Sequence, residues 1–267
     1  MLSIVMLTCN QIHLTYDCVE SLYQHTGAPD RWELCAVANG SRDQTPVYLQ
    51  AIERTRGNVR LVLNSENRGF AAGVNMGLRL ARGEYIALVN NDVIVTPCWS
   101  TPLRRALDGY WQLGLVASMT NLCGNAAMIP DCKYRGLDGM EEFAAARAFA
   151  HAGELLPLPM VGFYCVMFRR SLWEEIGDLD ERFFAYYDDD DWCLRARIAG
   201  YTCAAARDSF VHHVHEGSFR ALPGTRAQEI VADSRAKFQQ KWNVDLADAT
   251  PGDYSYLDTL VQRERKA

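Results

Sequence analysis

Short apolar runs alternate with amphipathic stretches over the first 90 residues of the chain. Four apolar runs have the length of a strand that is buried on both faces, and they lie at 2–7, 32–38, 59–63 and 85–89. Three stretches with apolar residues at helical spacing separate them, at 12–24, 46–54 and 72–80. This alternation predicts an α/β fold whose mostly parallel, Rossmann-like sheet is flanked by helices.

The second half of the chain is less regular. Further strands are expected at 113–119 and 160–168, and further helices at 103–110, 171–176, 192–199 and 225–242. Residues 121–159 mix Gly, Pro and Asn with one Ala-rich helical segment, which indicates an insertion over the sheet edge. We therefore expect one domain over 1–222, and at 223–267 a C-terminal helix packed on it with a polar tail from Ala247 onward.

Polar residues cluster where the predicted strands end. Thr8 and Asn10 follow the first strand, Asn39 to Asp43 follow the second, and Asn90 to Asp92 follow the fourth. Ligands of open α/β sheets bind at the carboxyl ends of the strands, so these residues are candidates for a binding site. Four consecutive aspartates at 188–191 precede a predicted helix. The helix dipole favours one or two acidic residues at this position, but four adjacent carboxylates repel each other and need a further reason.

The histidines add a second kind of candidate ligand. His212, His213 and His215 lie within one short segment of the chain. Together with the strand-end carboxylates they suit Mn²⁺ or Mg²⁺ bridging a diphosphate better than a thiolate metal. Such an ion needs few protein ligands, because phosphate oxygens and water complete its shell.

The composition narrows the classes of function. A chain of 267 residues, 49% of them hydrophobic, can bury a large core, and its net charge of −6 argues against a nucleic-acid-binding protein. Nine cysteines without a Cys-x-x-Cys pair indicate reduced thiols, which are typical of a cytoplasmic protein. We expect neither a signal peptide nor a transmembrane segment, and a peripheral association with a membrane stays open.

Seven segments form an ordered set of motifs. They are VMLTCN at 5–10, VANGSRD at 37–43, NRGFAAGVNMG at 67–77, YIALVNNDVIVTP at 85–97, GFYCVMFRRSLWEEIGDLDERFF at 162–184, YYDDDDWCLRARIAGY at 186–201 and VHHVHEGS at 211–218. Together they resemble an inverting family 2 glycosyltransferase of the GT-A fold, with a pattern similar to its rhamnosyltransferase-like branch. The resemblance covers residues 1 to about 242 and leaves the insertion unmatched.

The resemblance implies a site for a nucleoside diphosphate sugar. The donor-binding residues would be Thr8, Asn10, Asn39, Ser41, Asn67, Gly69, Phe70, Asn75, Asn91 and Gly162. Asn39 takes the position of the residue that hydrogen-bonds the base, and Asn91 lies near the sugar and ribose. Asp92 matches the metal-binding aspartate of the DxD-type motif, and His213 matches a histidine that ligates the metal in some members. His212 and His215 stay alternatives.

The aspartate run supplies the implied acid–base chemistry. Asp189 matches the catalytic base of the family, and Asp188, which takes the preceding Glu position, is the main rival for that role. Neighbouring carboxylates would raise the pKa of the base, which favours proton acceptance near neutral pH. Asp191 is expected to pair with Arg195 one turn along the helix, and Asp190 is expected to be solvated.

Two positions depart from the family pattern. Ala38 stands where the family usually has aspartate, which removes a contact to the base or ribose. The motif at 90–92 holds a single carboxylate, so metal binding would depend more on the diphosphate and on His213.

The implied function is metal-assisted transfer of a sugar, with inversion, from a UDP- or dTDP-sugar to a glycan, lipid-linked glycan or protein acceptor. A divalent cation offsets the charge of the leaving diphosphate, and a carboxylate base activates the acceptor hydroxyl. A catalytically silent nucleotide-sugar-binding or scaffold protein on the same fold is the alternative. A sugar-phosphate nucleotidyltransferase is less favoured, because the segment after the first strand lacks a Gly-rich, basic phosphate loop.

Overall fold

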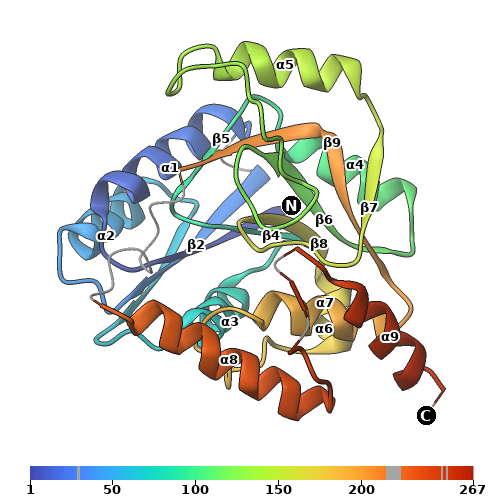
Figure 1. The fold of residues 1–267 in the computed structure, drawn as a ribbon. Coiled ribbons are helices and arrows are strands. Elements are labelled where there is room, and N and C mark those ends of the chain that lie inside the picture. The colour runs from blue at the N-terminus through green and yellow to red at the C-terminus, as the bar shows by residue number, and fades with distance from the viewer. Residues whose placement is uncertain (29–30, 215–223, 248, 251, 267) are drawn as a thin grey trace.

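The computed structural model describes residues 1–28, 31–214, 224–247, 249–250 and 252–266. These residues form one sheet with helices packed on its two faces (Figure 1). The strands are β1 (Leu2–Thr8), β2 (Trp32–Asn39), β3 (Val59–Asn64), β4 (Tyr85–Val89), β5 (Val93–Val95), β6 (Leu113–Thr120), β7 (Leu155–Leu158), β8 (Cys165–Arg169) and β9 (Thr202–His213). The helices are α1 (Ile12–His25), α2 (Thr45–Thr55), α3 (Phe70–Leu80), α4 (Ser100–Gly109), α5 (Met140–Ala150), α6 (Arg170–Ile176), α7 (Asp188–Ile198), α8 (Arg226–Trp242) and α9 (Ser255–Glu264).

The strand order is β3-β2-β1-β4-β8-β6-β9-β5, and β7 pairs with β9. β1 runs parallel to β2 and β4, β2 to β3, and β6 to β9, whereas β8 is antiparallel to both β4 and β6. The predicted α/β fold with a mostly parallel sheet flanked by helices is therefore confirmed. The carboxyl ends of β1, β2 and β4 lie at one edge, where the polar clusters begin.

Two apolar clusters fill the two faces, because side chains alternate along each strand. Ile4 and Met6 of β1 pack in one cluster with α1, α2 and α4. Val5, between them, packs in the other cluster with α3, α6 and α7. Phe238 of α8 and Leu257 of α9 join that second cluster, so the C-terminal helices extend the layer under the sheet in Figure 1.

Several predicted boundaries were wrong. α7 begins at Asp188 rather than at Trp192, so all four aspartates lie in its first turn. The chain after Ala247 is not simply a polar tail, because Leu257, Leu260 and Val261 bury one face of α9. The strand expected at 160–168 starts only at Cys165.

Three strands were not predicted. β5 and β7 are short, and both pair antiparallel with β9. β9 begins with a run rich in alanine, a residue with weak strand preference, so its sequence carries little strand signal. β7 also ties the end of the 121–159 insertion into the sheet. Among the described residues, no helix combines the length and apolar character needed to cross a bilayer.

Candidate functional site

The loop after β2 is organised around the amide of Asn39, which is 1% exposed. Its Nδ2 donates to Asn67 Oδ1 at 2.9 Å and to the Gly69 carbonyl at 3.0 Å. Its Oδ1 accepts from the backbone N–H of Arg68 at 3.1 Å and from Asn64 Nδ2 at 3.0 Å. Both donors and both lone pairs are thus occupied, so a contact to a nucleotide base would have to break one of these bonds.

The turn after β1 is held by the turn after β2. The backbone N–H of Asn10 donates to Ser41 Oγ at 2.9 Å, and Asn10 Oδ1 accepts from the Arg42 N–H at 2.7 Å. Asn10 and Gln11 both have left-handed backbones, with φ of 59° and 57°. Such strain in non-glycine residues concentrates at functional sites, and here the cross-links between the two turns hold it in place. Ala38 is buried among apolar side chains and adds no polar group at this edge.

The Gly-rich loop connects this edge to the segment before the aspartates. Gly69 has φ of +87°, and a Cβ there would lie 2.7 Å from the Phe184 carbonyl oxygen. The N–H of Phe70 donates to that same oxygen at 2.5 Å. Gly162 lies in the loop before β8, where the nearest atoms to a built Cβ belong to Tyr164.

Two predicted donor residues lie deeper than expected. Thr8 is 1% exposed, and its hydroxyl donates to the Val37 carbonyl at 3.3 Å. Asn75 is completely buried, and its Nδ2 donates to the Leu179 carbonyl at 2.9 Å and to Glu181 Oε1 at 3.0 Å. Asn75 therefore tethers α3 to the segment that leads to α7.

The motif at the end of β4 divides its side chains between core and edge. Asn91 is buried, and its Nδ2 donates to Thr15 Oγ1 on α1 at 3.1 Å. Asn90 is half-buried, and its backbone N–H donates to the Tyr164 carbonyl at 2.9 Å. Asn90, which the strand-end pattern also made a candidate, is thus the more accessible amide of the motif.

Asp92 and His213 meet at the same edge. The Asp92 Oδ1 to His213 Nε2 distance is 3.3 Å, and both side chains are nearly buried. His213 Nδ1 lies 3.0 Å from the Leu122 carbonyl, and its ring stacks on Tyr164 with 5.6 Å between the ring centroids. The Asn121 side chain forms hydrogen bonds with both the backbone N–H and the carbonyl of His213. Burial lowers the pKa of His213, but the hydrogen bond and charge of Asp92 outweigh it, and the net direction is upward.

The other histidine candidates differ. His212 Nδ1 hydrogen-bonds Tyr134 Oη at 2.7 Å, and burial lowers the pKa of this imidazole. His215 lies outside the described residues. Within the described part of the chain, no three His, Cys, Asp or Glu side chains gather into a protein-only metal site. A metal at this edge would therefore need ligands from a bound diphosphate and water.

The first turn of α7 holds three carboxyls, those of Asp188, Asp189 and Asp190, that form no ion pair with any residue the structure describes. Tyr186 and Tyr187, both with left-handed backbones, lead into it. Burial raises the pKa of Asp189 to about 6, although the backbone N–H of Asp190 donates to its Oδ1 at 3.1 Å. Burial, followed by the charge of Asp189, raises the pKa of Asp188 and of Asp190 well above the ordinary range. Asp189 is the half-buried member of the three, whereas Asp188 and Asp190 are buried.

Asp190 is not solvated, contrary to expectation. It is 7% exposed, and its Oδ1 accepts a hydrogen bond from Tyr256 Oη of α9 at 3.0 Å. The expectation failed because α9, which covers this side of α7, was not predicted.

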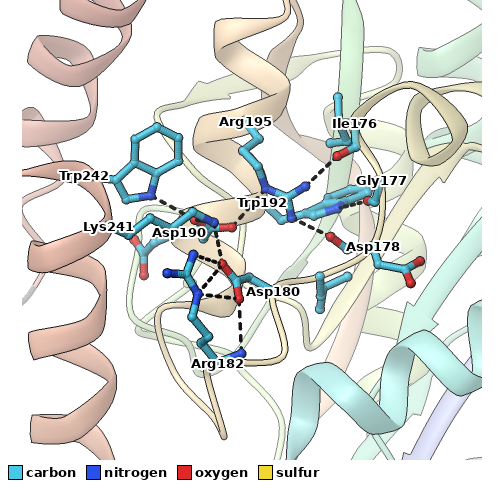
Figure 2. A network of polar contacts seen from close by, with 12 residues as sticks. Ile176, Gly177, Asp178, Asp180, Arg182, Asp190, Trp192, Arg195, Lys241 and Trp242 are labelled. Carbon is cyan, nitrogen blue, oxygen red and sulfur yellow. Dashed lines mark hydrogen bonds and ion pairs between the residues drawn. The ribbon is translucent and has the colours of Figure 1, made fainter.

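Asp191 is fully neutralised, and its predicted pairing with Arg195 is confirmed. Arg195 Nε lies 3.0 Å from Asp191 Oδ2, and Lys241 Nζ lies 2.6 Å from Oδ1. Trp242 Nε1 donates to Oδ1 at 2.8 Å. Figure 2 shows Lys241 and Trp242 reaching from α8 toward the start of α7, where Lys241 also meets Asp180 at 2.7 Å. Asp191 is therefore structural.

Most of the chain matches a known protein family. The pattern described as Glycosyl transferase family 2 matches residues 3–177 of the 267 residues. The chain belongs to glycosyltransferase family 2. The matched part of this family 2 glycosyltransferase includes the loop around Asn39 and the motif at 90–92, and it ends before the aspartates of α7.

Solved structures show the same GT-A fold. The mannosyltransferase PcManGT from Pyrobaculum calidifontis, solved with GDP-Man and Mn²⁺, has a TM-score of 0.62 and 19% identity over 99% of this chain and 68% of that chain. TarS of S. aureus, solved with UDP-GlcNAc, has a TM-score of 0.59 and 14% identity over 98% of this chain and 71% of that chain.

Among curated relatives, the uncharacterized protein y4gI of Sinorhizobium fredii is 26% identical over 266 residues, which cover 90% of this chain and 26% of that protein. The matches to the curated relatives span 24% to 33% of those proteins' own length.

Two further contributors to this family 2 site were missed. Asn121 directly follows β6 at the same edge, so the strand-end rule that found Asn39 and Asp92 would also have found it. Tyr256 carries no such signal, because it reaches Asp190 from 66 positions along the chain.

Proposed function

We propose that the chain is an inverting, metal-assisted glycosyltransferase that moves a sugar from a nucleoside diphosphate sugar to an acceptor hydroxyl. The observation that carries the proposal is that two different kinds of site, a carboxylate–imidazole pair and a carboxyl with a raised pKa, occur together. Asp92 and His213 approach within 3.3 Å on one side, and the half-buried Asp189 has a pKa of about 6 on the other. Membership of family 2 and the GDP-Man and Mn²⁺ complex of PcManGT support this assignment.

Asp92 and His213 fit a divalent ion. With Nδ1 of His213 engaged by the Leu122 carbonyl, its Nε2 faces Asp92, which puts an imidazole nitrogen and a carboxylate oxygen together. That donor set suits Mn²⁺ or Mg²⁺. When bound, the ion would act as a Lewis acid and offset the charge that develops on the leaving diphosphate.

Asp189 is the proposed base. The Asp190 N–H fixes one carboxylate oxygen, which leaves the other for the acceptor hydroxyl. A pKa of about 6 keeps Asp189 ionised at neutral pH and makes it a stronger base than an ordinary aspartate. It takes the hydroxyl proton while the acceptor oxygen attacks the anomeric carbon and the bond to the diphosphate breaks. This single displacement inverts the anomeric centre.

A UDP- or dTDP-sugar is our proposed donor, and a glycan, a lipid-linked glycan or a protein is our proposed acceptor. The amide of Asn39 has all its hydrogen bonds within the protein, so backbone groups of the same loop would carry base recognition. The nucleotide needs a direct test, since the two solved neighbours were crystallised with different ones, GDP-Man and UDP-GlcNAc.

A thermal-shift panel of UDP, dTDP and GDP with and without Mn²⁺ tests the donor side. We expect one nucleotide to raise the melting temperature more in the presence of Mn²⁺, because ligands of the native state stabilise it by mass action. Asp92→Ala should abolish the Mn²⁺ enhancement, and Asp233→Ala, on the surface of α8, should keep it. Enhancement that persists in Asp92→Ala would contradict the metal assignment.

Turnover separates an enzyme from a silent binding protein. The wild-type chain is expected to hydrolyse the matching nucleotide sugar slowly and to transfer from it to an added acceptor. Nucleotide binding without hydrolysis or transfer for UDP-, dTDP- and GDP-sugars would favour the silent nucleotide-sugar-binding protein instead.

A further inference from the structure

We infer that Tyr256 of the C-terminal helix is a positioning residue for Asp189 and that it acts through Asp190. The inference rests on the proposed function, in which Asp189 accepts the proton. Tyr256 Oη donates to Asp190 Oδ1 at 3.0 Å, and the backbone N–H of Asp190 donates to Asp189 Oδ1 at 3.1 Å. A hydroxyl from α9 is therefore two hydrogen bonds away from the base.

The Tyr256 side chain is itself firmly placed. Its ring meets Phe238 of α8 edge-on, with centroids 6.0 Å apart and an interplanar angle of 82°. The neighbouring Leu257 is completely buried, so α9 is anchored to the core beside Tyr256. Rings held by packing on two sides lose little further freedom when they form a hydrogen bond, which makes them effective supports for a site.

Asp190 depends on this hydroxyl more than its neighbour does. The cations in reach, Arg195 and Lys241, bind Asp191. Among the described residues, the structure gives the Asp190 carboxyl a hydrogen bond from Tyr256 and no ion pair. A carboxyl that is 7% exposed and loses its partner has a strong drive to turn or shift. Its backbone N–H, which holds Asp189, would move with it.

A double-mutant cycle tests whether Tyr256 acts through Asp190. Tyr256→Phe keeps the ring and removes the hydroxyl, and we expect kcat to fall by roughly tenfold with the KM for the nucleotide sugar unchanged. Asp190→Ala should lower kcat similarly. In the Asp190→Ala background, Tyr256→Phe should have no further effect, since the bond is already absent. Equal effects of Tyr256→Phe in both backgrounds, or no effect in either, would overturn the inference.

Tyr254→Phe is the matched control on the same segment. Its hydroxyl donates to the Gly124 carbonyl at 3.4 Å, and it is expected to keep wild-type kcat. A loss in Tyr254→Phe as large as that in Tyr256→Phe would show a general effect of the segment and would also overturn the inference.

A readout without turnover separates this inference from the proposed function. Tyr256→Phe should speed hydrogen exchange of the Asp190 backbone amide, because the hydrogen bond of this amide to Asp189 loosens. In Tyr254→Phe, the Asp190 amide should exchange as in the wild type. Faster exchange in Tyr256→Phe, combined with a wild-type protein that shows neither hydrolysis nor transfer, would refute the enzymatic function and keep the positioning contact. Unchanged exchange would sink the positioning contact in an active enzyme.

Discussion

Two groups of aspartates at one end of the same sheet have opposite electrostatics. In the loop after β2, Asp43 Oδ2 accepts from the Ile12 N–H at 2.9 Å, and Oδ1 accepts from the Thr45 N–H at 3.0 Å. Burial raises the pKa of Asp43, but these hydrogen bonds outweigh it and the net pKa is lowered. At the start of α7, burial raises the pKa of Asp188, Asp189 and Asp190.

The difference lies in the partners and not in the residue type. Backbone N–H groups at the starts of α1 and α2 stabilise the Asp43 carboxylate, which serves as a clamp between two helices. In α7, Arg195 and Lys241 pair with Asp191, and burial disfavours the charged form of the three preceding carboxyls. When two residues of the same type lie in different environments, their pKa values move apart, and one fold can then use one of them for structure and the other for proton transfer.

The sharpest way to break this comparison is to remove the base. Asp189→Asn should reduce transfer by about 10²- to 10⁴-fold, the usual contribution of a general base, and leave nucleotide affinity intact. Steady-state kinetics and nucleotide titration measure the two properties. Asp233→Asn removes an exposed carboxylate on α8 and is the control. Transfer at the wild-type rate in Asp189→Asn would remove Asp189 from the role of base.

Next in size is the structural aspartate of α7. Asp191→Ala removes the carboxylate that Lys241 and Arg195 share. Because loss of one partner from a buried ion pair is strongly destabilising, this variant should lose about 3 kcal/mol of unfolding free energy. Urea denaturation measures this. Asp233→Ala breaks an exposed pair with Lys237 and should cost less than about 1 kcal/mol. Equal losses in the two variants would show that Asp191 is no more structural than a surface residue.

On the donor side, Asn39 provides the third test. Asn39→Ala removes four hydrogen bonds from a buried loop and should lower the unfolding free energy by about 2 kcal/mol. Because the side chain has no bond left for a base, affinities for UDP, dTDP and GDP should fall together. Isothermal titration with the three nucleotides checks this, and a selective loss for one of them would restore Asn39 as a base-reading residue.

The sequence was informative where the site is local. Strand ends placed Asn39 and Asp92 at one sheet edge, because an apolar run that stops at polar residues can be read from neighbouring positions alone. Hydrogen-bond partners that are distant along the chain could not be predicted. Asn75 was expected at the donor, and it is buried because Leu179, 104 positions away, folds against it.

The aspartate run shows the same limit more strongly. Sequence reasoning favoured Asp189 within the run and paired Asp191 with Arg195 correctly, since that contact is one helical turn. It misjudged Asp190, whose burial depends on Tyr256. The environment of each aspartate is set by α8 and α9, and their placement depends on tertiary packing that no local pattern encodes.

The smallest effect is a pH dependence that should have opposite signs at the two groups. The pKa of Asp189 is raised from 3.8 to about 6 in the folded state, so its stabilising contribution is present below pH 3.8 and is lost as the pH rises through 6. Relative to Asp189→Asn, the wild type should therefore lose about 1 kcal/mol of unfolding free energy between pH 4 and 7, after allowance for solvent screening. Transfer should rise over the same interval, because the base ionises.

For Asp43 the pKa is lowered, so its stabilising contribution is present above the unfolded pKa of 3.8 and is lost as the pH falls through the folded value. The wild type should exceed Asp43→Asn in stability at pH 7, and the gap should narrow in acid. Urea denaturation of both variants between pH 3 and 7 gives the two slopes. Slopes of the same sign would mean that the two groups of aspartates share one environment, and the assignment of structural and catalytic roles to opposite sides of the edge would fail.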